Sequence, residues 1–187
     1  MTTNNNLFIL TNTKGEITNY ISDLYRKNNN GKWISPIKMQ KTLYFLCAFW
    51  FSARENILTN FEYIDPLATS NELVKNLFSD SKLFEISFSA WKYGPVNRET
   101  YDFFKTIKSP NNISILALSF NRKLEVTLTK KIEEWFENYC LRIFATEDFA
   151  LVNLSHNDKA WIEAINEEMG TPMSLETIEN EYINKTI

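Results

Sequence analysis

The sequence predicts an α+β protein that is predominantly α-helical, with about seven helices and a small two- or three-stranded antiparallel sheet. Apolar residues recur at helical spacing in most segments, and capping signals precede several of them. Clean alternation of apolar and polar residues is confined to short stretches. The 187 residues suit one domain. We expect an N-terminal tail at 1–13 and a single domain at 14–187.

Helix starts are marked by local capping chemistry. Thr13 and Glu16 have the spacing of a capping box. Ser35 precedes Pro36, so an N-cap residue stands before a proline at the first helical position. The helix that begins there is expected to run to about residue 55. Further helix starts are predicted, in order, at Thr69, Pro95, Thr129, Ser155 with Asp158, and Ser174.

Strand signals are fewer than helix signals. Residues 84–91 alternate cleanly between apolar and polar types, and residues 124–128 do so over a shorter span. Residues 113–120 form a weaker third candidate. Asn121 and Arg122 lie between the last two segments and predict a tight turn there.

The most apolar element is the helix predicted to begin at Ser35, because residues 43–51 are apolar without a break. A helix that is apolar on all sides is normally buried on all sides. We therefore expect a central core helix. The alternative is a partly exposed aromatic patch on this helix that docks a partner. Nine residues are too few for a bilayer span, which needs roughly 20, so no membrane segment is expected.

Cysteine usage and the N-terminus favour a cytoplasmic protein. Cys47 and Cys140 lie far apart among apolar residues, which predicts two reduced, buried thiols. Residues 1–6 are polar and uncharged, unlike a signal peptide.

Charge is unevenly distributed along the chain. Residues 1–131 hold 17 basic and 11 acidic residues, whereas residues 132–187 hold 3 basic and 12 acidic residues. The simplest interpretation is a mixed surface. The alternative is an acidic face that attracts a basic partner. Its candidate residues are Glu163, Glu167, Glu168, Glu176, Glu179 and Glu181.

No constellation of residues suggests catalysis. The single histidine, His156, follows Ser155 directly, and adjacent residues at a helix start do not face each other as base and nucleophile. We expect His156 to be a packed, hydrogen-bonded residue at a helix start. Two distant cysteines and one histidine do not make a zinc site, and no glycine-rich phosphate loop is present. We expect no catalytic residue, metal ligand or cofactor.

The stretch 91–96 predicts a corner between a strand and a helix. The strand ends at Trp91, Gly94 can adopt a positive φ at the turn, and Pro95 fixes φ for a following helix. Lys92 and Tyr93 are then presented at a rigid turn.

An ordered set of motifs resembles one family. The chain reads KMQKTLYF at 38–45, FE at 84–85, AWKYGPV at 90–96, LSH at 154–156 and MSL at 173–175. This set resembles the Panacea antitoxin domain, also described as the SocA-like or phage-associated GepA-like domain, over about residues 14–185. The chain departs from the family pattern at Thr42 and over 109–128.

The resemblance implies a mostly helical domain with a small sheet, encoded beside toxin genes and on mobile elements. It implies that members neutralise different toxins by direct protein contact. The shared motif residues are then expected to be structural in role. They are Lys41, Tyr44, Trp91, Tyr93, Gly94, Pro95, His156 and Trp161.

The expected function is that of an antitoxin, not an enzyme, that binds and occludes a cognate toxic protein. Three rivals stay open: an anti-defence protein that inhibits a host nuclease, an adaptor that delivers a toxin to a protease, and a DNA-binding autoregulator. The net charge of −3 argues against DNA binding, although the basic N-terminal portion favours it. The oligomeric state is not determined by any pattern in the sequence.

Overall fold

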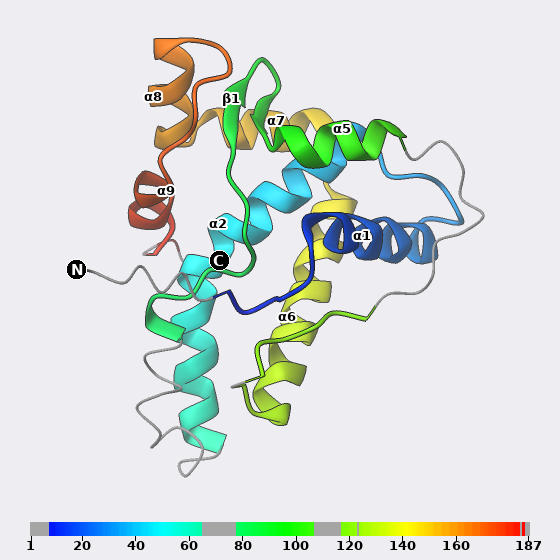
Figure 1. The fold of residues 1–187 in the computed structure, drawn as a ribbon, viewed down its shortest axis with the longest axis vertical. Helices are drawn as coiled ribbons and strands as arrows, with labels where there is room; N and C mark the ends of the chain where they lie inside the picture. Colours follow the sequence, from blue (N-terminus) through cyan, green and yellow to red (C-terminus); the bar gives the residue numbers. More distant parts are fainter. Residues whose placement is uncertain (1–7, 65–77, 107–116, 123, 184, 186–187) are drawn as a thin grey trace.

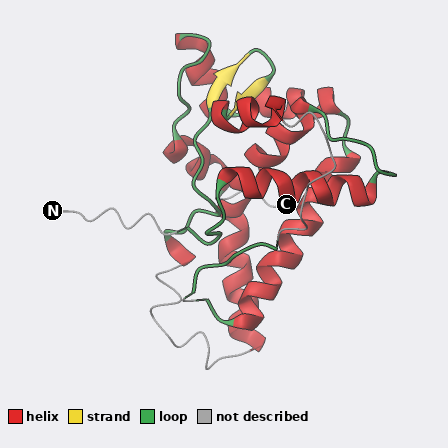
Figure 2. Cartoon of the chain, turned by 45° about the vertical axis from the view of Figure 1, so that its right-hand side comes forward, coloured by secondary structure: helices red, strands yellow, loops and turns green. Residues whose placement is uncertain are grey.

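The computed structural model describes residues 8–64, 78–106, 117–122, 124–183 and 185. That part contains seven named helices and one two-stranded antiparallel sheet, which confirms the predicted fold class (Figures 1 and 2). The elements are α1 (Lys14–Asn28), α2 (Pro36–Ile64), β1 (Ser89–Trp91), β2 (Gly94–Val96), α5 (Arg98–Thr106), α6 (Val126–Ala145), α7 (Asp148–His156), α8 (Lys159–Glu167) and α9 (Leu175–Tyr182).

Helix α2 lies at the centre of the fold and the others pack around it (Figure 1). From Lys38 to Arg54 every side chain is buried except Phe49, which is half-buried. Helices α1, α5, α6, α7 and α9 and strand β2 all contact α2. The predicted core helix is therefore confirmed, and it extends beyond the expected end to Ile64.

The helix starts that rest on local capping chemistry are confirmed. Thr13 and Glu16 form the reciprocal capping box at α1. The Ser35 hydroxyl accepts a hydrogen bond from the Lys38 backbone N–H at 3.0 Å, and the Ser174 hydroxyl caps α9 in the same way. The helix start predicted at Thr69 lies outside the described residues.

The strand predicted at 124–128 is wrong. Helix α6 begins at Val126, so the helix start predicted at Thr129 is also three residues late. Leu128 and Ile132 are both fully buried four residues apart, whereas Val126 is 83% exposed. Burial at helical spacing thus outweighs the short alternation. The predicted turn is present, since the Leu124 backbone N–H bonds to the Asn121 carbonyl, and it leads into α6.

The strand predicted at 84–91 is correct in its faces but too long. Side chains alternate between buried and exposed along it, yet only Ser89–Trp91 pairs as a strand. Its partner is β2, with Trp91 opposite Gly94. Residues 170–173 lie along the other side of β1 and hydrogen-bond to its backbone. Only 117–120 of the third candidate strand lie within the described residues, where Phe120 forms a single bridge with Leu10.

Two further predicted helix starts need correction. Pro95 belongs to β2, and α5 begins at Arg98, where the Asn97 side chain accepts from the Thr100 backbone N–H at 2.8 Å. The hairpin forms because β1 finds a backbone partner in 94–96. Ser155 lies inside α7, and Asp158 alone is the N-cap residue of α8.

Both cysteines are free and buried, as predicted. Burial raises the pKa of both thiols well above the usual range. In the part of the chain that the structure describes, no helix has both the length and the apolar character needed to cross a membrane.

Phe136 tests the packing of α6 against the core. Its side chain is 0% exposed, so Phe136→Ala leaves a cavity and should lower the free energy of unfolding by about 3–5 kcal/mol. Glu134→Ala, at an exposed position on the same helix, should change it by less than about 0.5 kcal/mol. Urea denaturation followed by tryptophan fluorescence measures both. Equal effects of the two substitutions would contradict the described packing.

Candidate functional site at the hairpin

A two-residue turn joins β1 and β2 into a hairpin, and strand β2 packs against α2 and α7. Lys92 and Tyr93 form the turn, and Gly94 follows with φ of +91°. A Cβ atom on Gly94 would lie 2.7 Å from Lys41 Nζ and closer still to Ser155 Oγ. Glycine is therefore needed twice here, once for the left-handed backbone and once for the close approach of two polar side chains.

Lys41 is the most unusual residue of the site. Its side chain is 1% exposed, and its ammonium donates a hydrogen bond to the Pro95 carbonyl at 3.0 Å. Burial lowers the pKa of Lys41 from its usual 10.5 to about 7, because the charged form loses its hydration. The group is therefore only partly protonated at neutral pH.

Two other cationic side chains of α2 are buried, and both have a carboxylate partner. Lys38 Nζ lies 3.1 Å from Asp148 Oδ1, and Arg54 Nη2 lies 2.5 Å from Glu179 Oε1. Within the described residues, Lys41 has the Pro95 carbonyl as its hydrogen-bond acceptor and no carboxylate within ion-pairing distance. Lys41 is thus a buried amine that, when protonated, has no carboxylate counter-charge in the described part of the chain.

His156 lies close to this lysine at the end of α7, not at a helix start as predicted. Its ring stacks on Trp161 with centroids 3.9 Å apart and an interplanar angle of 12°. Its Nε2 atom is buried with no hydrogen-bond partner in the described part of the chain. Burial and the neighbouring Lys41 charge both lower the pKa of His156, while a hydrogen bond with the Lys92 backbone opposes them. The imidazole is therefore held towards its neutral form.

The tryptophans connect α8 to the hairpin. Trp161 Nε1 donates to the Trp91 carbonyl at 3.2 Å, and the Trp91 ring packs against Tyr101 of α5. These contacts hold the hairpin between α5 and α8.

Tyr44 anchors the start of α8 to the core. Its hydroxyl donates to Asp158 Oδ2 at 2.7 Å, and the Tyr182 hydroxyl donates to the same oxygen at 2.8 Å. Lys185 Nζ lies 3.3 Å from the other carboxylate oxygen. Burial raises the pKa of Asp158, and the two hydroxyl donors oppose that rise. This buried carboxylate therefore links α2, α8 and α9.

A cleft of about 380 Å³ opens beside the hairpin. Aromatic and aliphatic side chains form most of its wall, and Gln40, Lys41 and Lys92 contribute the polar groups. Gln40 is already satisfied, because it accepts from the Asn97 backbone and donates to Thr100. The lining residues are Pro36, Ile37, Gln40, Lys41, Trp91, Lys92, Tyr93, Val96, Tyr101 and Met169.

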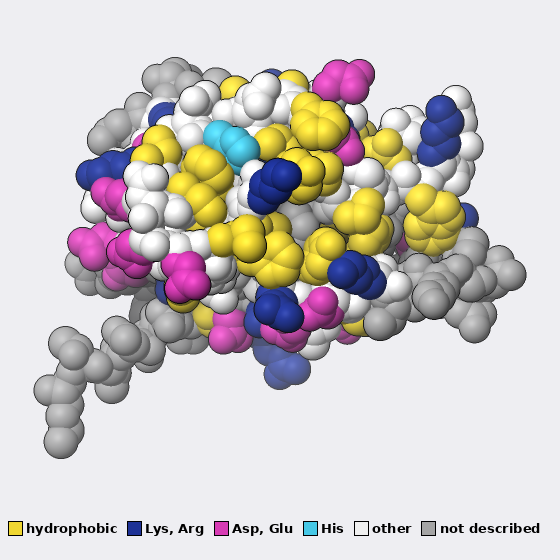
Figure 3. Space-filling model, turned by 90° about the horizontal axis from the view of Figure 1, so that it is seen from above, with side chains coloured by type: hydrophobic (Ala, Val, Ile, Leu, Met, Phe, Trp, Pro, Cys, Tyr) yellow, Lys and Arg dark blue, Asp and Glu magenta, His cyan; other side chains and the backbone are white. Residues whose placement is uncertain are grey.

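The surface around the cleft is largely apolar, and several cationic side chains lie over its aromatic rings. We call the exposed side chains of Tyr93, Phe149 and Met169, together with the cleft, the hairpin face; their exposed fractions are 48%, 64% and 66%. Tyr93 and Phe149 contact each other edge to face at 6.4 Å. Figure 3 shows hydrophobic side chains gathered across this end of the molecule. The nearby cations are Lys92, over the Tyr93 ring, Arg98, over Trp91, and Lys105, over Tyr101.

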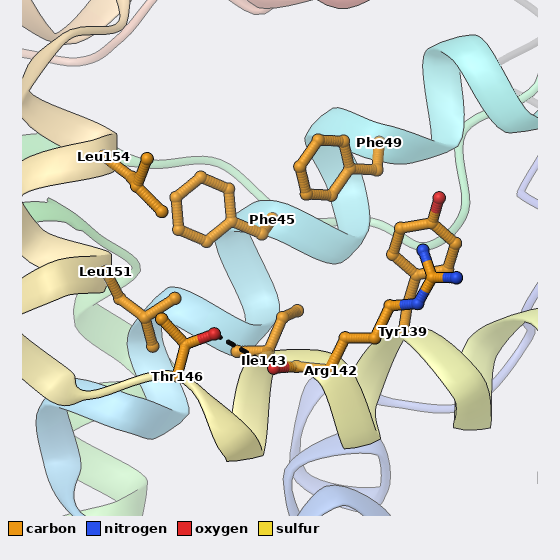
Figure 4. Close-up of a pocket in the computed structure, with 8 residues that line it drawn as sticks. All are labelled: Phe45, Phe49, Tyr139, Arg142, Ile143, Thr146, Leu151 and Leu154. Atoms are coloured by element: carbon orange, nitrogen blue, oxygen red, sulfur yellow. Dashed lines mark hydrogen bonds between the residues drawn. The ribbon is translucent and has the colours of Figure 1, made fainter. Parts of the chain in front are cut away.

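A second, smaller hollow of about 190 Å³ lies between α2, α6 and α7 (Figure 4). Phe45 and Phe49 of α2 face Tyr139 of α6 and Leu154 of α7 across it. Its wall is mostly apolar, and the Arg142 guanidinium lies over the Tyr139 ring. Among the described residues, this hollow has no buried charged group without a partner. It therefore indicates less about the chemistry of a ligand than the cleft does.

The predicted acidic face is partly neutralised. Glu179 pairs with Arg54, and Glu181 pairs with Lys185 at 3.0 Å and accepts from the Lys159 backbone N–H. Glu163 lies 3.6 Å from Lys159 Nζ. The remaining three acidic residues are exposed: Glu167, Glu168 and Glu176.

A model of the protein family described as antitoxin SocA-like, Panacea domain, matches residues 75–173, more than half of this chain. The chain belongs to this family. The match includes the hairpin and α5 to α8, and Lys41 and Tyr44 of α2 lie before it. Family membership indicates an antitoxin-type role in general terms. No curated protein matches the chain, and no solved structure does.

Seven of the eight family-motif residues singled out in the sequence lie in or next to this hairpin, and the eighth, Tyr44, bonds to Asp158 instead. Lys41 bonds to Pro95, and His156 and Trp161 stack beside them. Sequence reasoning missed the exposed Phe149 and Met169. Phe149 begins the apolar run 149–152, which does not show which of its members is exposed, and Met169 stands alone among polar residues without a periodic signal. It also missed that the buried Asp158 carboxylate accepts a hydrogen bond from Tyr44, which lies 114 residues away in the sequence.

Gly94 tests the close packing of the hairpin. Gly94→Ala should lower the free energy of unfolding by about 3 kcal/mol or more, since a left-handed conformation and a steric clash add together. Gly31→Ala is the matched control, with φ of +76° and open space around its Cβ position. It should cost only the conformational strain, about 1–2 kcal/mol. Urea denaturation of both variants checks the difference, and equal losses would argue against the described approach of Lys41 and Ser155.

Lys41 should give stability a characteristic pH dependence. Its pKa is about 7 in the folded protein and near 10.5 when unfolded. Between these values the unfolded state holds more protons, so the contribution of Lys41 to stability rises with pH, with a slope approaching ~1.4 kcal/mol per unit. Relative to Lys41→Met, the wild-type protein should be least stable below pH 7 and should gain as the pH rises. A pH-independent difference, measured by urea denaturation from pH 6 to 9, would show that Lys41 keeps an ordinary pKa.

Proposed function

We propose that this protein is the antitoxin of a toxin–antitoxin pair and neutralises its cognate toxin by direct protein–protein binding. Membership of the SocA-like family supports the antitoxin role. The observation that carries the binding mode is the hairpin face, where Tyr93, Phe149 and Met169 are exposed around an apolar cleft.

The composition of the hairpin face supports protein binding. Aromatic residues and methionine are enriched at protein interfaces, and energetic hot spots gather in well-packed pockets. Lys92 and Lys105 lie over aromatic rings next to the apolar centre, and Arg98 does so while paired with Asp102 at 3.7 Å. The two lysines favour a partner surface that carries acidic groups. We therefore propose the hairpin face, ahead of the acidic face, as the toxin-binding surface.

We propose that the protein acts without catalysis. Burial is the largest cause of the pKa shifts of Tyr44, Cys47 and Lys41. Occlusion of a toxin needs no reacting group, only a surface complementary to it.

Co-expression with the product of the adjacent gene tests the function. We expect the neighbour alone to arrest growth, and this protein to restore growth and co-purify with it as a stoichiometric complex. Restored growth with loss of the toxin from cells would instead indicate a protease adaptor. A harmless neighbour would contradict the antitoxin role and favour the anti-defence function.

Substitution of the hairpin face tests the binding surface. Phe149→Asp combined with Met169→Asp places two charges in the apolar centre and should weaken toxin binding on the order of 30-fold or more. Val126→Asp is the matched control, because Val126 is 83% exposed at the start of α6, far from the hairpin (Figure 1). Calorimetry with the purified toxin measures both. Equal affinities of the two variants would rule out the hairpin face.

The acidic face is a second candidate for the toxin-binding surface, and a separate set of substitutions tests it. Glu179 and Glu181 form internal ion pairs, so reversing their charge would disturb the fold as well as the surface. Charge reversal at Glu167, Glu168 and Glu176 avoids this problem. Unchanged toxin binding by that triple variant would contradict a role for the acidic face.

A further inference from the structure

Lys41 has no carboxylate partner among the described residues, and this indicates that the cleft binds an anion. Moving an ammonium group out of water costs several kcal/mol unless a partner compensates it. Asp148 and Glu179 provide that compensation for Lys38 and Arg54, the other two buried cations of α2. Lys41 has one carbonyl acceptor in the described part of the chain, although an ammonium group carries three donors.

The position of Lys41 suggests where its counter-charge comes from. Its side chain forms part of the wall of the 380 Å³ cleft, and this cleft opens on the hairpin face. Lys92 lines the same cleft, and His156, which lies close to Lys41, has a buried Nε2 with no hydrogen-bond partner in the described part of the chain. An anion that enters the cleft thus meets a favourable potential and a low-dielectric wall.

The chemistry of the wall selects the kind of anion. Trp91, Tyr93, Tyr101 and Met169 make most of the wall apolar. One buried ammonium group matches one negative charge, whereas a phosphate group carries more charge and is usually held by several donors or arginines. A singly charged carboxylate on an apolar body fits both the charge and the wall.

We propose that this cleft receives a carboxylate carried by the bound toxin, an aspartate, glutamate or C-terminal carboxylate beside apolar residues, and that Lys41 is its counter-ion. The proposal rests on the proposed antitoxin function for the identity of the partner. It deepens that function by assigning the partner's chemistry at the centre of the hairpin face. Lys41 then serves as a specificity element, because its charge is fully compensated only in the complex.

A small carboxylate tests the site without the toxin. In protein labelled with ¹³C-lysine, phenylacetate at millimolar concentration should raise the pKa of Lys41, since an anion favours the charged amine. Phenylacetamide has the same shape without the charge and should leave the pKa unchanged. The signal is assigned by its loss in Lys41→Met. Equal shifts with the two compounds, or no shift with either, would overturn the carboxylate site.

Toxin binding by the Lys41→Met variant is the second experiment. Lys41→Met should fold with at least wild-type stability at pH 6, because a buried unpaired charge is removed, yet should bind the toxin on the order of 30-fold more weakly. Lys130→Met, at an exposed lysine of α6, is the matched control and should bind normally. A purely structural Lys41 would give the opposite pattern, with lost stability and unchanged affinity.

Together the two experiments distinguish a free small carboxylate from one carried by the toxin. Phenylacetate binding together with undiminished toxin binding by Lys41→Met would assign the cleft to a free small carboxylate and overturn the toxin-borne one. Wild-type toxin binding without any effect of Lys41→Met leaves the antitoxin function intact and removes only the role of Lys41. Failure of the wild-type protein to bind a toxin would instead count against the proposed function itself.

Discussion

The burial of helix α2 on all sides is the constraint on which the rest of the fold depends. Because its central turns are apolar around the whole circumference, every direction must be covered. Five helices and strand β2 provide that cover. Polar side chains on the same helix then need internal partners. Three of those pairings tie the surrounding elements to the core: Lys38 with Asp148, Tyr44 with Asp158, and Arg54 with Glu179.

Lys41 is the exception to this arrangement, and it lies where the hairpin meets the core. The hairpin approaches so closely that Gly94 has no room for a side chain beside Lys41 and Ser155. The same approach places the Pro95 carbonyl on the ammonium group. Family-motif residues thus fix the hairpin in space and at the same time leave Lys41 without a carboxylate partner among the described residues. Structural and binding roles need not be separate properties of different residues here.

The surrounding face has the composition of a protein-binding surface. Exposed side chains lie beside a cleft: Phe149 on α7, Tyr93 in the hairpin turn and Met169 in the turn after α8.

The sequence alone determined the features that depend on neighbouring residues or on composition. Thr13, Ser35 and Ser174 start helices because capping hydrogen bonds span only three residues. The core helix was predictable because an unbroken apolar run has no solvent-compatible face. The family, too, was recognisable from motifs in order along the chain.

The tertiary structure decided everything that depends on distant partners. Residues 124–128 alternate like a strand, but helix α6 begins at Val126, because helical spacing buries Leu128 and Ile132 in the core. Pro95 joins a hairpin because β1 offers it a backbone partner. Lys41 meets that proline 54 residues along the chain, and Glu179, one of the six predicted acidic residues, pairs with the buried Arg54 125 residues away. Burial and long-range hydrogen bonds set these outcomes, and local sequence does not encode them.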